Sequence, residues 1–299
     1  MADKTVDAAD SGTRAVQRVL HHYVRSARKR LGQGPPSDEA VHEARKAIKK
    51  SRTALRLLRP CLKKSHYRRA NQALRAAAHG LNAMRDALVL IQALADLRRR
   101  SAALRINPAA ARLAAQLQQE LSDARRRLNA RTLRAQCRTL RRIERRVRQL
   151  AIGRHDWSVL GPAVRRIYRQ GRYLLPTACA HPADPALHEW RKHVKYLRYA
   201  LKMLGPIQPV ALAALAKQAE GIGEQLGEAH DLALLHARAQ LLEGSSGPGR
   251  RHLLQTIEHE RTRRAFAALV AGERLFQPGP QEFEHKLERA WRRWHRRRA

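Results

Sequence analysis

The 299-residue sequence contains few cysteines, few aromatic residues and no long apolar run. Its three cysteines, Cys61, Cys137 and Cys179, are odd in number and far apart, which argues against a disulfide framework and against a zinc site. Charged or polar residues interrupt every apolar stretch well before the ~18 residues that a transmembrane helix requires. The N-terminal residues lack the apolar segment of a signal peptide. We therefore expect a cytoplasmic protein without a transmembrane segment.

Acidic residues are also scarce, with 25 Asp and Glu against 61 Lys and Arg, which gives a formal net charge of +36. Hydrophobic residues make up 43% of the chain, enough for a packed core, so a disordered basic tail is excluded. Positive side chains in such excess repel one another in the folded protein, and a polyanionic partner would offset this repulsion. Forty-nine of the basic residues are arginine, whose planar guanidinium matches phosphate oxygens. The composition therefore favours a phosphate-rich partner over a diffuse anionic membrane surface.

The residue pattern is helical throughout. Aromatic residues make up only 4% of the chain, and no segment shows the alternating pattern of a strand. Ala, Leu, Arg and Gln, which favour helices, dominate the sequence. Ser37 is the expected N-cap of a helix that carries Asp38 and Glu39 in its first turn. Turn and capping signals predict helices over about 13–31, 37–59, 64–100 (continuous or interrupted at Gly80), two segments within 107–152, and 162–179, 185–204, 208–226, 228–243, 249–273 and 281–298.

An internal repeat divides the chain into two similar halves. Residues 41–60 and 187–206 are identical at ten of twenty positions at an offset of 146. A second pair of segments, 81–90 and 226–235, aligns Asp86 with Asp231. We predict two copies of one helical unit, residues 1–152 and 153–299, each forming a bundle of about four helices.

The repeated segment carries a basic stripe. On a helical wheel, His42, Arg45, Lys49, Arg52 and Arg56 fall within an arc of about 80° beside an apolar face. The second copy repeats this stripe with His188, Arg191, Lys195, Arg198 and Lys202. Each stripe is about 20 Å long, and its side chains repel one another unless an anion is near. An ordinary amphipathic helix with basic solvent-facing positions explains one such stripe, but it explains poorly why both copies keep the same residues.

These residues resemble the CHAD family, the conserved-histidine α-helical domain. The family pattern is a helix that opens with His, has Arg three residues later and continues with basic residues, and it occurs twice per domain. A later Asp-containing helical turn follows in each half, here at Asp86 and Asp231. Lys46, Ser51, Trp190 and His193 depart from the usual pattern of the family.

The resemblance implies an all-α fold with two pseudo-twofold-related bundles and a basic central pore or groove. It also implies binding of inorganic polyphosphate, without catalysis, and association with polyphosphate granules. The expected polyphosphate-binding residues are His42, Arg45, Lys46, Lys49, Arg52, Arg56, His188, Arg191, Lys192, Lys195, Arg198 and Lys202. Neither a metal nor a cofactor is expected.

Several roles and alternatives stay open at this point. The two leading histidines either contact phosphate, gaining charge below about pH 6.5, or form structural hydrogen bonds. Asp86 and Asp231 are expected to orient a nearby arginine or to cap a helix, while Glu43 and Glu189 are expected to pair with basic residues one turn on. Two rival functions are a nucleic-acid-binding protein, for which weak non-specific binding is expected in any case, and an enzyme acting on phosphate esters.

We expect two motifs near the C-terminus to have structural roles and no function of their own. Glu282-Phe-Glu284-His-Lys286 resembles the signature of the CYTH-type triphosphatases that often accompany CHAD domains. Only 13 residues follow it, in a helical context, so we interpret it as a coincidence. Trp291 and Trp294 predict a last amphipathic helix that packs on the bundle, with a polyanion or membrane-surface anchor as the alternative.

Overall fold

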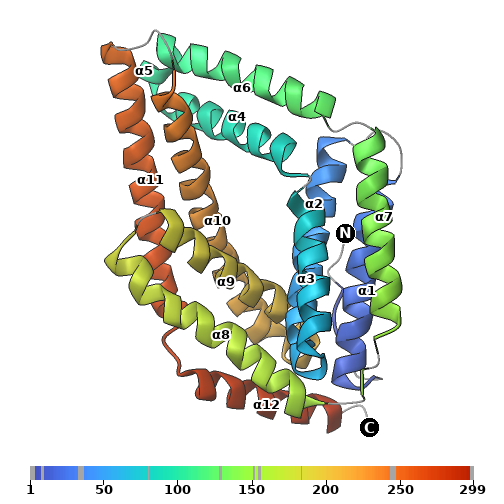
Figure 1. The fold of residues 1–299 in the computed structure, drawn as a ribbon. Helices are drawn as coiled ribbons and strands as arrows, with labels where there is room; N and C mark the ends of the chain where they lie inside the picture. Colours follow the sequence, from blue (N-terminus) through green and yellow to red (C-terminus); the bar gives the residue numbers. More distant parts are fainter. Residues whose placement is uncertain are drawn as a thin grey trace.

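The computed structural model describes residues 4–7, 10–32, 37–79, 81–127, 130–150, 152–153, 156–182, 184–242 and 247–296. The described residues form helices joined by short turns, which confirms the all-α prediction (Figure 1). The helices are α1 (Gly12–Leu31), α2 (Asp38–Leu57), α3 (Lys64–His79), α4 (Asn82–Arg100), α5 (Ala102–Arg105), α6 (Pro108–Arg127), α7 (Ala130–Arg148), α8 (Trp157–Ala180), α9 (Asp184–Met203), α10 (Pro209–Gln240), α11 (Pro248–Leu275) and α12 (Pro280–Arg296), with the 3₁₀ turns η1 (Arg59–Cys61) and η2 (Gly205–Ile207).

Helix numbers differ from the expected four in each half. The described part of the chain before residue 150 contains seven helices, and the part after it contains five. The predicted segment 64–100 is divided into α3 and α4; Gly80, where we allowed an interruption, lies outside the described residues. The N-cap prediction is confirmed, because Ser37 Oγ accepts a hydrogen bond from the backbone N–H of Ala40 at 3.1 Å.

One long helix replaces two that we expected in the second half. α10 continues through Gly227, where the sequence suggested a break. Gly227 serves packing instead, because a Cβ at this position would lie 2.9 Å from Nη2 of Arg191. A glycine inside a helix can mark the close approach of another side chain as well as a turn.

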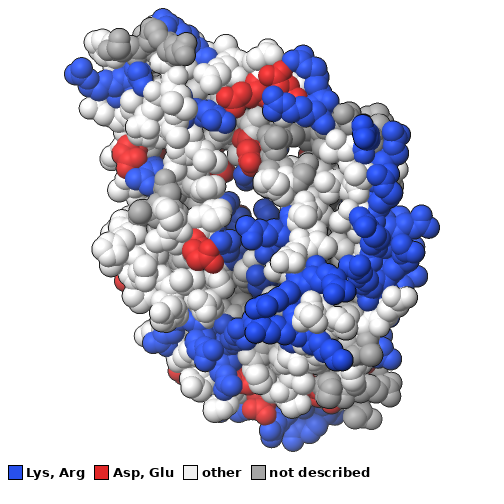
Figure 2. All heavy atoms as spheres, viewed as in Figure 1, with Lys and Arg blue, Asp and Glu red and all other residues white. Residues whose placement is uncertain are grey.

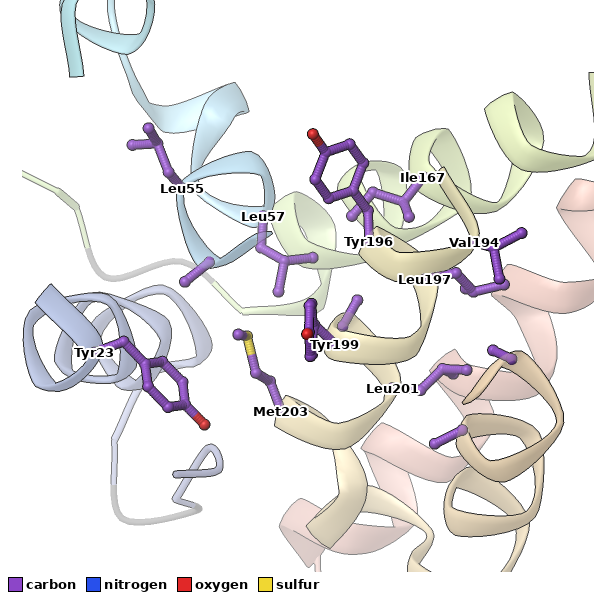
Figure 3. Packing of buried hydrophobic residues seen from close by; sticks show 14 of the residues in the cluster. Tyr23, Leu55, Leu57, Ile167, Val194, Tyr196, Leu197, Tyr199, Leu201 and Met203 are labelled. Atoms are coloured by element: carbon purple, nitrogen blue, oxygen red, sulfur yellow. The ribbon is translucent and has the colours of Figure 1, made fainter. Parts of the chain in front are cut away.

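The sequence repeat reappears in the helix bounds. α2 and α9 each contain 20 residues and begin 146 residues apart, and η1 and η2 follow them at the same offset. The division at residues 152–153 stays a prediction, because one core joins the two halves. In Figure 3, Tyr23 of α1 and Leu57 of α2 lie beside Tyr199 and Met203 of α9.

A second, smaller hydrophobic cluster fastens an arm, residues 82–127, which comprises α4, α5 and α6. Leu94 of α4 and Leu113 of α6 pack here with Leu235 of α10 and Ile257 of α11. The main core and this cluster together close a cycle of helices, in which α2 contacts α4 and α9, and α10 also contacts α4 and α9 (Figure 1).

The C-terminal helix packs on the bundle, as predicted. α12 lies against α8, and Trp291 and Trp294 are buried. The Trp291 ring lies 5.6 Å from that of Trp157, between ring centroids. Among the described residues, no helix has an apolar run long enough to cross a membrane.

Two glycines provide a test of the helix packing. A Cβ on Gly272 of α11 would lie 2.5 Å from ring atoms of Trp190, which is fully buried. The Trp190 ring is also held by its Nε1–H, which donates to the carbonyl of Gly171 at 3.1 Å. Gly221 of α10, by contrast, has no atom within 4 Å of the position of an added Cβ.

We expect opposite effects from alanine at these two positions. Gly272→Ala should lower the free energy of unfolding by about 1–3 kcal/mol, because the new methyl group overpacks the core. Gly221→Ala should raise it by about 0.4–1 kcal/mol, because alanine restricts the unfolded chain and favours the helix. Urea denaturation of both variants measures the difference. A Gly272→Ala protein as stable as the wild type would mean that the Trp190 ring can move aside.

Candidate anion-binding site

Five cations meet where the four helices of the cycle come together. They are Arg45 and Lys49 of α2, Arg85 of α4, and Arg191 and Lys195 of α9, and we call them the central cluster. Lys49 is close enough to Arg45, Arg85 and Arg191 for their charges to act on it. The charges of Arg191, Lys49 and Arg85 act in the same way on Lys195. The structure thus brings four of the predicted site residues from both repeats into one place, together with Arg85.

The protonation of both lysines in this cluster is disfavoured. Burial, and then the charges of Arg45, Arg85 and Arg191, lower the pKa of Lys49 from 10.5 to about 7. Burial, and then Arg191 and Lys49, lower the pKa of Lys195 well below its usual value. Arg45 is 9% exposed, and burial lowers its pKa to about 10. The folded protein therefore holds positive charge that its own groups do not fully compensate.

Two carboxylates accompany the cluster. Arg85 Nη1 lies 3.4 Å from Asp231 Oδ1 and 3.6 Å from Asp86 Oδ1. This confirms that Asp86 and Asp231 orient a nearby arginine. Asp231 also partly offsets the lowering of the pKa of Arg191. Among the described residues, the three arginines alone outnumber the two carboxylates, so the cluster keeps a net positive charge even where its lysines are neutral.

Backbone contacts fix the two arginines of the repeated helices. Arg45 donates from Nη1 to the carbonyl of Leu81 at 2.9 Å. The guanidinium of Arg191 lies against Gly227 of α10, and the side chain of Lys195 passes Gly223. Within the described part of the chain, Nε of Arg191 is buried without a hydrogen-bond partner. Burying an unbonded donor is unfavourable, so the free protein holds Arg191 at a cost in free energy.

Lys46 and Lys192, although predicted to bind, have carboxylate partners on their own helices. Lys46 Nζ lies 2.8 Å from Glu43 Oε1, and Lys192 forms the equivalent ion pair with Glu189. The predicted pairing of the two glutamates one turn on is confirmed. Both lysines therefore have a carboxylate that compensates their charge.

The far ends of the two stripes differ. On α9, Arg198 and Lys202 both form ion pairs with Glu220 of α10, at 3.1 Å for Lys202. On α2, Arg52 donates to Asn71 Oδ1 at 3.1 Å, and the guanidinium of Arg56 lies 3.6 Å from the ring centroid of Tyr196. Aromatic and amide contacts do not neutralise a guanidinium, so the end of the α2 stripe retains its charge.

Neither leading histidine forms a structural hydrogen bond with the described residues, and their contact with phosphate stays a prediction. His42 is exposed at the start of α2, while the ring of His188 packs 4.8 Å from that of His230, between centroids. Nδ1 of His188 is buried without a hydrogen-bond partner among the described groups. Burial, and then His230, lower the pKa of His188 to about 4. His188 is therefore neutral at pH 7, and its gain of charge is shifted below the range that we expected.

Basic side chains gather on the face shown in Figure 2. The molecule is hollowed near its centre, and Lys and Arg side chains border the hollow and continue below it in a band. A further series of basic side chains follows α7, along the opposite edge of the view from α11. Exposed arginines of α7 include Arg134, Arg138, Arg141 and Arg145.

Sequence reasoning missed three participants in this site. Arg85 is not among the predicted site residues, although its place beside Asp86 in the second repeated segment is a usable signal. Glu220 and His230 lie on α10, 22 and 42 residues beyond the residues that they contact, Arg198 and His188. No local spacing connects residues that far apart.

The positions of these repeated helices agree with a known family. The CHAD domain model matches residues 14–240 of the sequence. The chain belongs to the CHAD domain family. The resemblance found in the two His-led motifs is thereby confirmed.

Solved structures show the same fold at low sequence identity. PptA from Streptomyces chartreusis shares 19% identity and a TM-score of 0.65, over 89% of this chain and 99% of that chain. The CHAD domain from the plant Ricinus communis shares 18% identity and a TM-score of 0.59, over 93% of each chain. No curated protein matches the sequence. Within the described part of this CHAD domain, no three His, Cys, Asp or Glu side chains are grouped to hold a metal ion.

Proposed function

We propose that this CHAD domain binds inorganic polyphosphate, without catalysing a reaction, and that the central cluster is its main site. Family membership already connects the chain to polyphosphate. The observation that carries the proposal is the pair of lysines, Lys49 and Lys195, held beside three arginines with depressed pKa values. A chain of phosphates would supply the negative charge that these groups lack, at closely spaced oxygen acceptors.

The geometry favours a slim polyanion without bases. The central cluster lies half-buried among four helices, and its cations come from three of them. Among the described residues, it offers no aromatic platform of the kind on which single-stranded nucleic acids stack. We further propose that the hollow in Figure 2 is a basic pore for the phosphate chain, and that the protein resides at polyphosphate granules.

Nucleic-acid binding is the second candidate, because α7 presents a separate basic surface. Its exposed arginines lie on one outer helix face, which a nucleic-acid duplex could approach. The same duplex would be too wide to reach the central cluster. Phosphate contacts of this kind are independent of base sequence and weaken steeply with salt. The two candidates therefore use different residues and can be tested separately.

A crossed competition experiment distinguishes these functions. At ~150 mM salt, where weak non-specific attraction is largely screened, long-chain polyphosphate should displace duplex DNA from the wild type, and DNA should not displace polyphosphate. Arg191→Gln should weaken polyphosphate binding about tenfold to a hundredfold, through loss of a charged hydrogen bond, with DNA binding unchanged. The triple variant Arg138→Gln, Arg141→Gln, Arg145→Gln should do the reverse. Equal displacement by both polymers, or an Arg191→Gln protein that binds polyphosphate normally, would make nucleic acid the better candidate.

A further inference from the structure

A second group of arginines lines a pocket that the repeated motifs do not account for. Arg56 and Arg59, at the end of α2 and in η1, face Arg165, Arg166 and Arg169 of α8 across a cavity of about 320 Å³. We call these five residues the arginine pocket. An adjoining cavity of about 170 Å³ continues past Tyr67, His193 and Tyr196. The pocket exists only because α8 packs against η1 and α2.

The charge of the arginine pocket is almost uncompensated. Arg165 Nη1 pairs with Glu284 Oε2 at 2.9 Å, whereas the other four arginines form no ion pair with a carboxylate of the described residues. Burial, and then the charge of Arg59, lower the pKa of Arg166. The four guanidinium groups around the cavity repel one another, and an anion in the cavity would relieve this repulsion.

Aromatic rings hold two of these arginines in place. The Arg56 guanidinium lies 3.6 Å from the ring centroid of Tyr196, and that of Arg59 lies 5.1 Å from the ring centroid of Tyr67. Such contacts position a guanidinium while leaving its N–H groups free to donate. The pocket is therefore preorganised for phosphate oxygens.

The arginine pocket continues the charged path of the central cluster. Arg56 follows Lys49 by seven residues on α2, a rise of about 10 Å along the helix, and Arg52 lies between them on the same stripe. The corresponding path on α9 carries less net positive charge, because Arg198 and Lys202 share the carboxylate of Glu220 as an ion-pair partner. A polyanion that leaves the central cluster thus encounters uncompensated cations along α2.

We propose that the arginine pocket is a second phosphate site, which takes the part of a polyphosphate chain that extends beyond the central cluster along α2. The inference rests on the proposed function and adds Arg59, Arg165, Arg166 and Arg169 to it. A chain that occupies both places is bound more tightly than a fragment that occupies one, since the second contact is intramolecular.

The test compares long-chain polyphosphate with tripolyphosphate in the variant Arg166→Gln, Arg169→Gln. Both residues are exposed, so the fold should persist. Long-chain affinity should fall about tenfold, and the slope of log affinity against log salt should fall by about 1.4–1.8, as for two lost phosphate contacts. Tripolyphosphate, too short to reach from Arg45 to the pocket, should lose much less. The control Arg141→Gln, Arg145→Gln removes the same charge from α7 and should change neither affinity.

Comparison of the arginine-pocket variant with the α7 control shows whether the loss of affinity is specific to the pocket. Equal losses for long and short ligands, or the same loss in the α7 control, would overturn the second site and indicate a general field effect. A wild type that does not bind long-chain polyphosphate at ~150 mM salt would refute the proposed function as well.

A local readout separates the two proposals. In a protein carrying Lys49→Met and Lys195→Met, tripolyphosphate should still shift the side-chain Nε–Hε NMR signals of Arg59 and Arg166. Shifted signals, together with lost tight binding of long chains, support two sites. Unshifted signals would overturn the arginine pocket and leave the central cluster as the proposed site.

Discussion

Replacing Lys49 and Lys195 together by methionine is expected to stabilise the free protein and to abolish tight polyphosphate binding. Both lysines lie beside three arginines, and their pKa values are depressed chiefly by burial. Methionine fills a similar volume and leaves no charge to desolvate. Replacement of buried charges by apolar residues is often stabilising by about 1–4 kcal/mol. Opposite changes in stability and binding would identify these lysines as ligand-binding groups.

The expected loss of affinity is large, about a hundredfold or more, because two charge-assisted contacts disappear at once. Urea denaturation measures the stability, and fluorescence anisotropy with labelled long-chain polyphosphate measures the affinity. Lys63→Met with Lys64→Met is the matched control, since these lysines are exposed at the start of α3 and carry the same charge. A central variant that is less stable than the wild type yet binds normally would show that the two lysines have a structural role.

Polyphosphate affinity should fall steeply as the pH rises from about 7 to 9, by up to tenfold per pH unit for each proton taken up on binding. The pKa of Lys49 is about 7 in the free protein, so this lysine is largely neutral at pH 9. A bound phosphate would raise that pKa, and binding above pH 7 would then require a proton. Lys49 alone predicts up to about a hundredfold loss over this range, and Lys195 adds to it.

The free protein, in contrast, should become more stable as the pH rises, for the same reason. The unfolded chain holds a proton on Lys49 up to about pH 10.5, whereas the folded protein loses it near pH 7. Between these values the unfolded state binds more protons, so the free energy of unfolding rises with pH. Burial is the largest cause of this lowered pKa, and the neighbouring charges of Arg45, Arg85 and Arg191 add to it, offset in part by Asp86.

Lys49→Arg provides the control for the pH dependence. Arginine keeps its charge across this range, so the variant should bind with a flatter pH profile. His188 and His193, whose pKa values lie at about 4, do not titrate here. Calorimetry in buffers of different ionisation enthalpy measures the proton uptake directly. Identical pH profiles for wild type and Lys49→Arg would exclude Lys49 as the titrating group.

The all-α fold and the two repeated helices could be predicted because their signals are local. Helical spacing placed Arg45 and Lys49 on one face, and Ser37 marked the start of their helix. Identity at an offset of 146 predicted that α9 would repeat α2. Glycine was less informative, since Gly227 accommodates Arg191 and does not end a helix.

The charge balance of the site could not be predicted, because it depends on residues brought together by tertiary packing. Glu220 of α10 pairs with Arg198, while Arg52, its counterpart in the first repeat, contacts Asn71. The repeat in the sequence predicts that these two arginines are equivalent. The arginine pocket was likewise hidden, since Arg59 and Arg166 are more than 100 residues apart in the chain.

The arm of α4, α5 and α6 has a consequence for how a long polymer enters. A strand of many phosphates rarely presents a free end, yet the cycle of α2, α4, α10 and α9 is closed by contacts. The arm is fastened to α10 and α11 through the smaller cluster around Leu113 and Ile257, separate from the main core. A region whose apolar contacts are separate from the main core can open locally without global unfolding. If the polymer occupies the proposed pore, side-on entry would require the arm to separate from α10 and α11. The lifetime of the complex would then depend on Leu113 and Ile257, which lie outside the proposed phosphate sites.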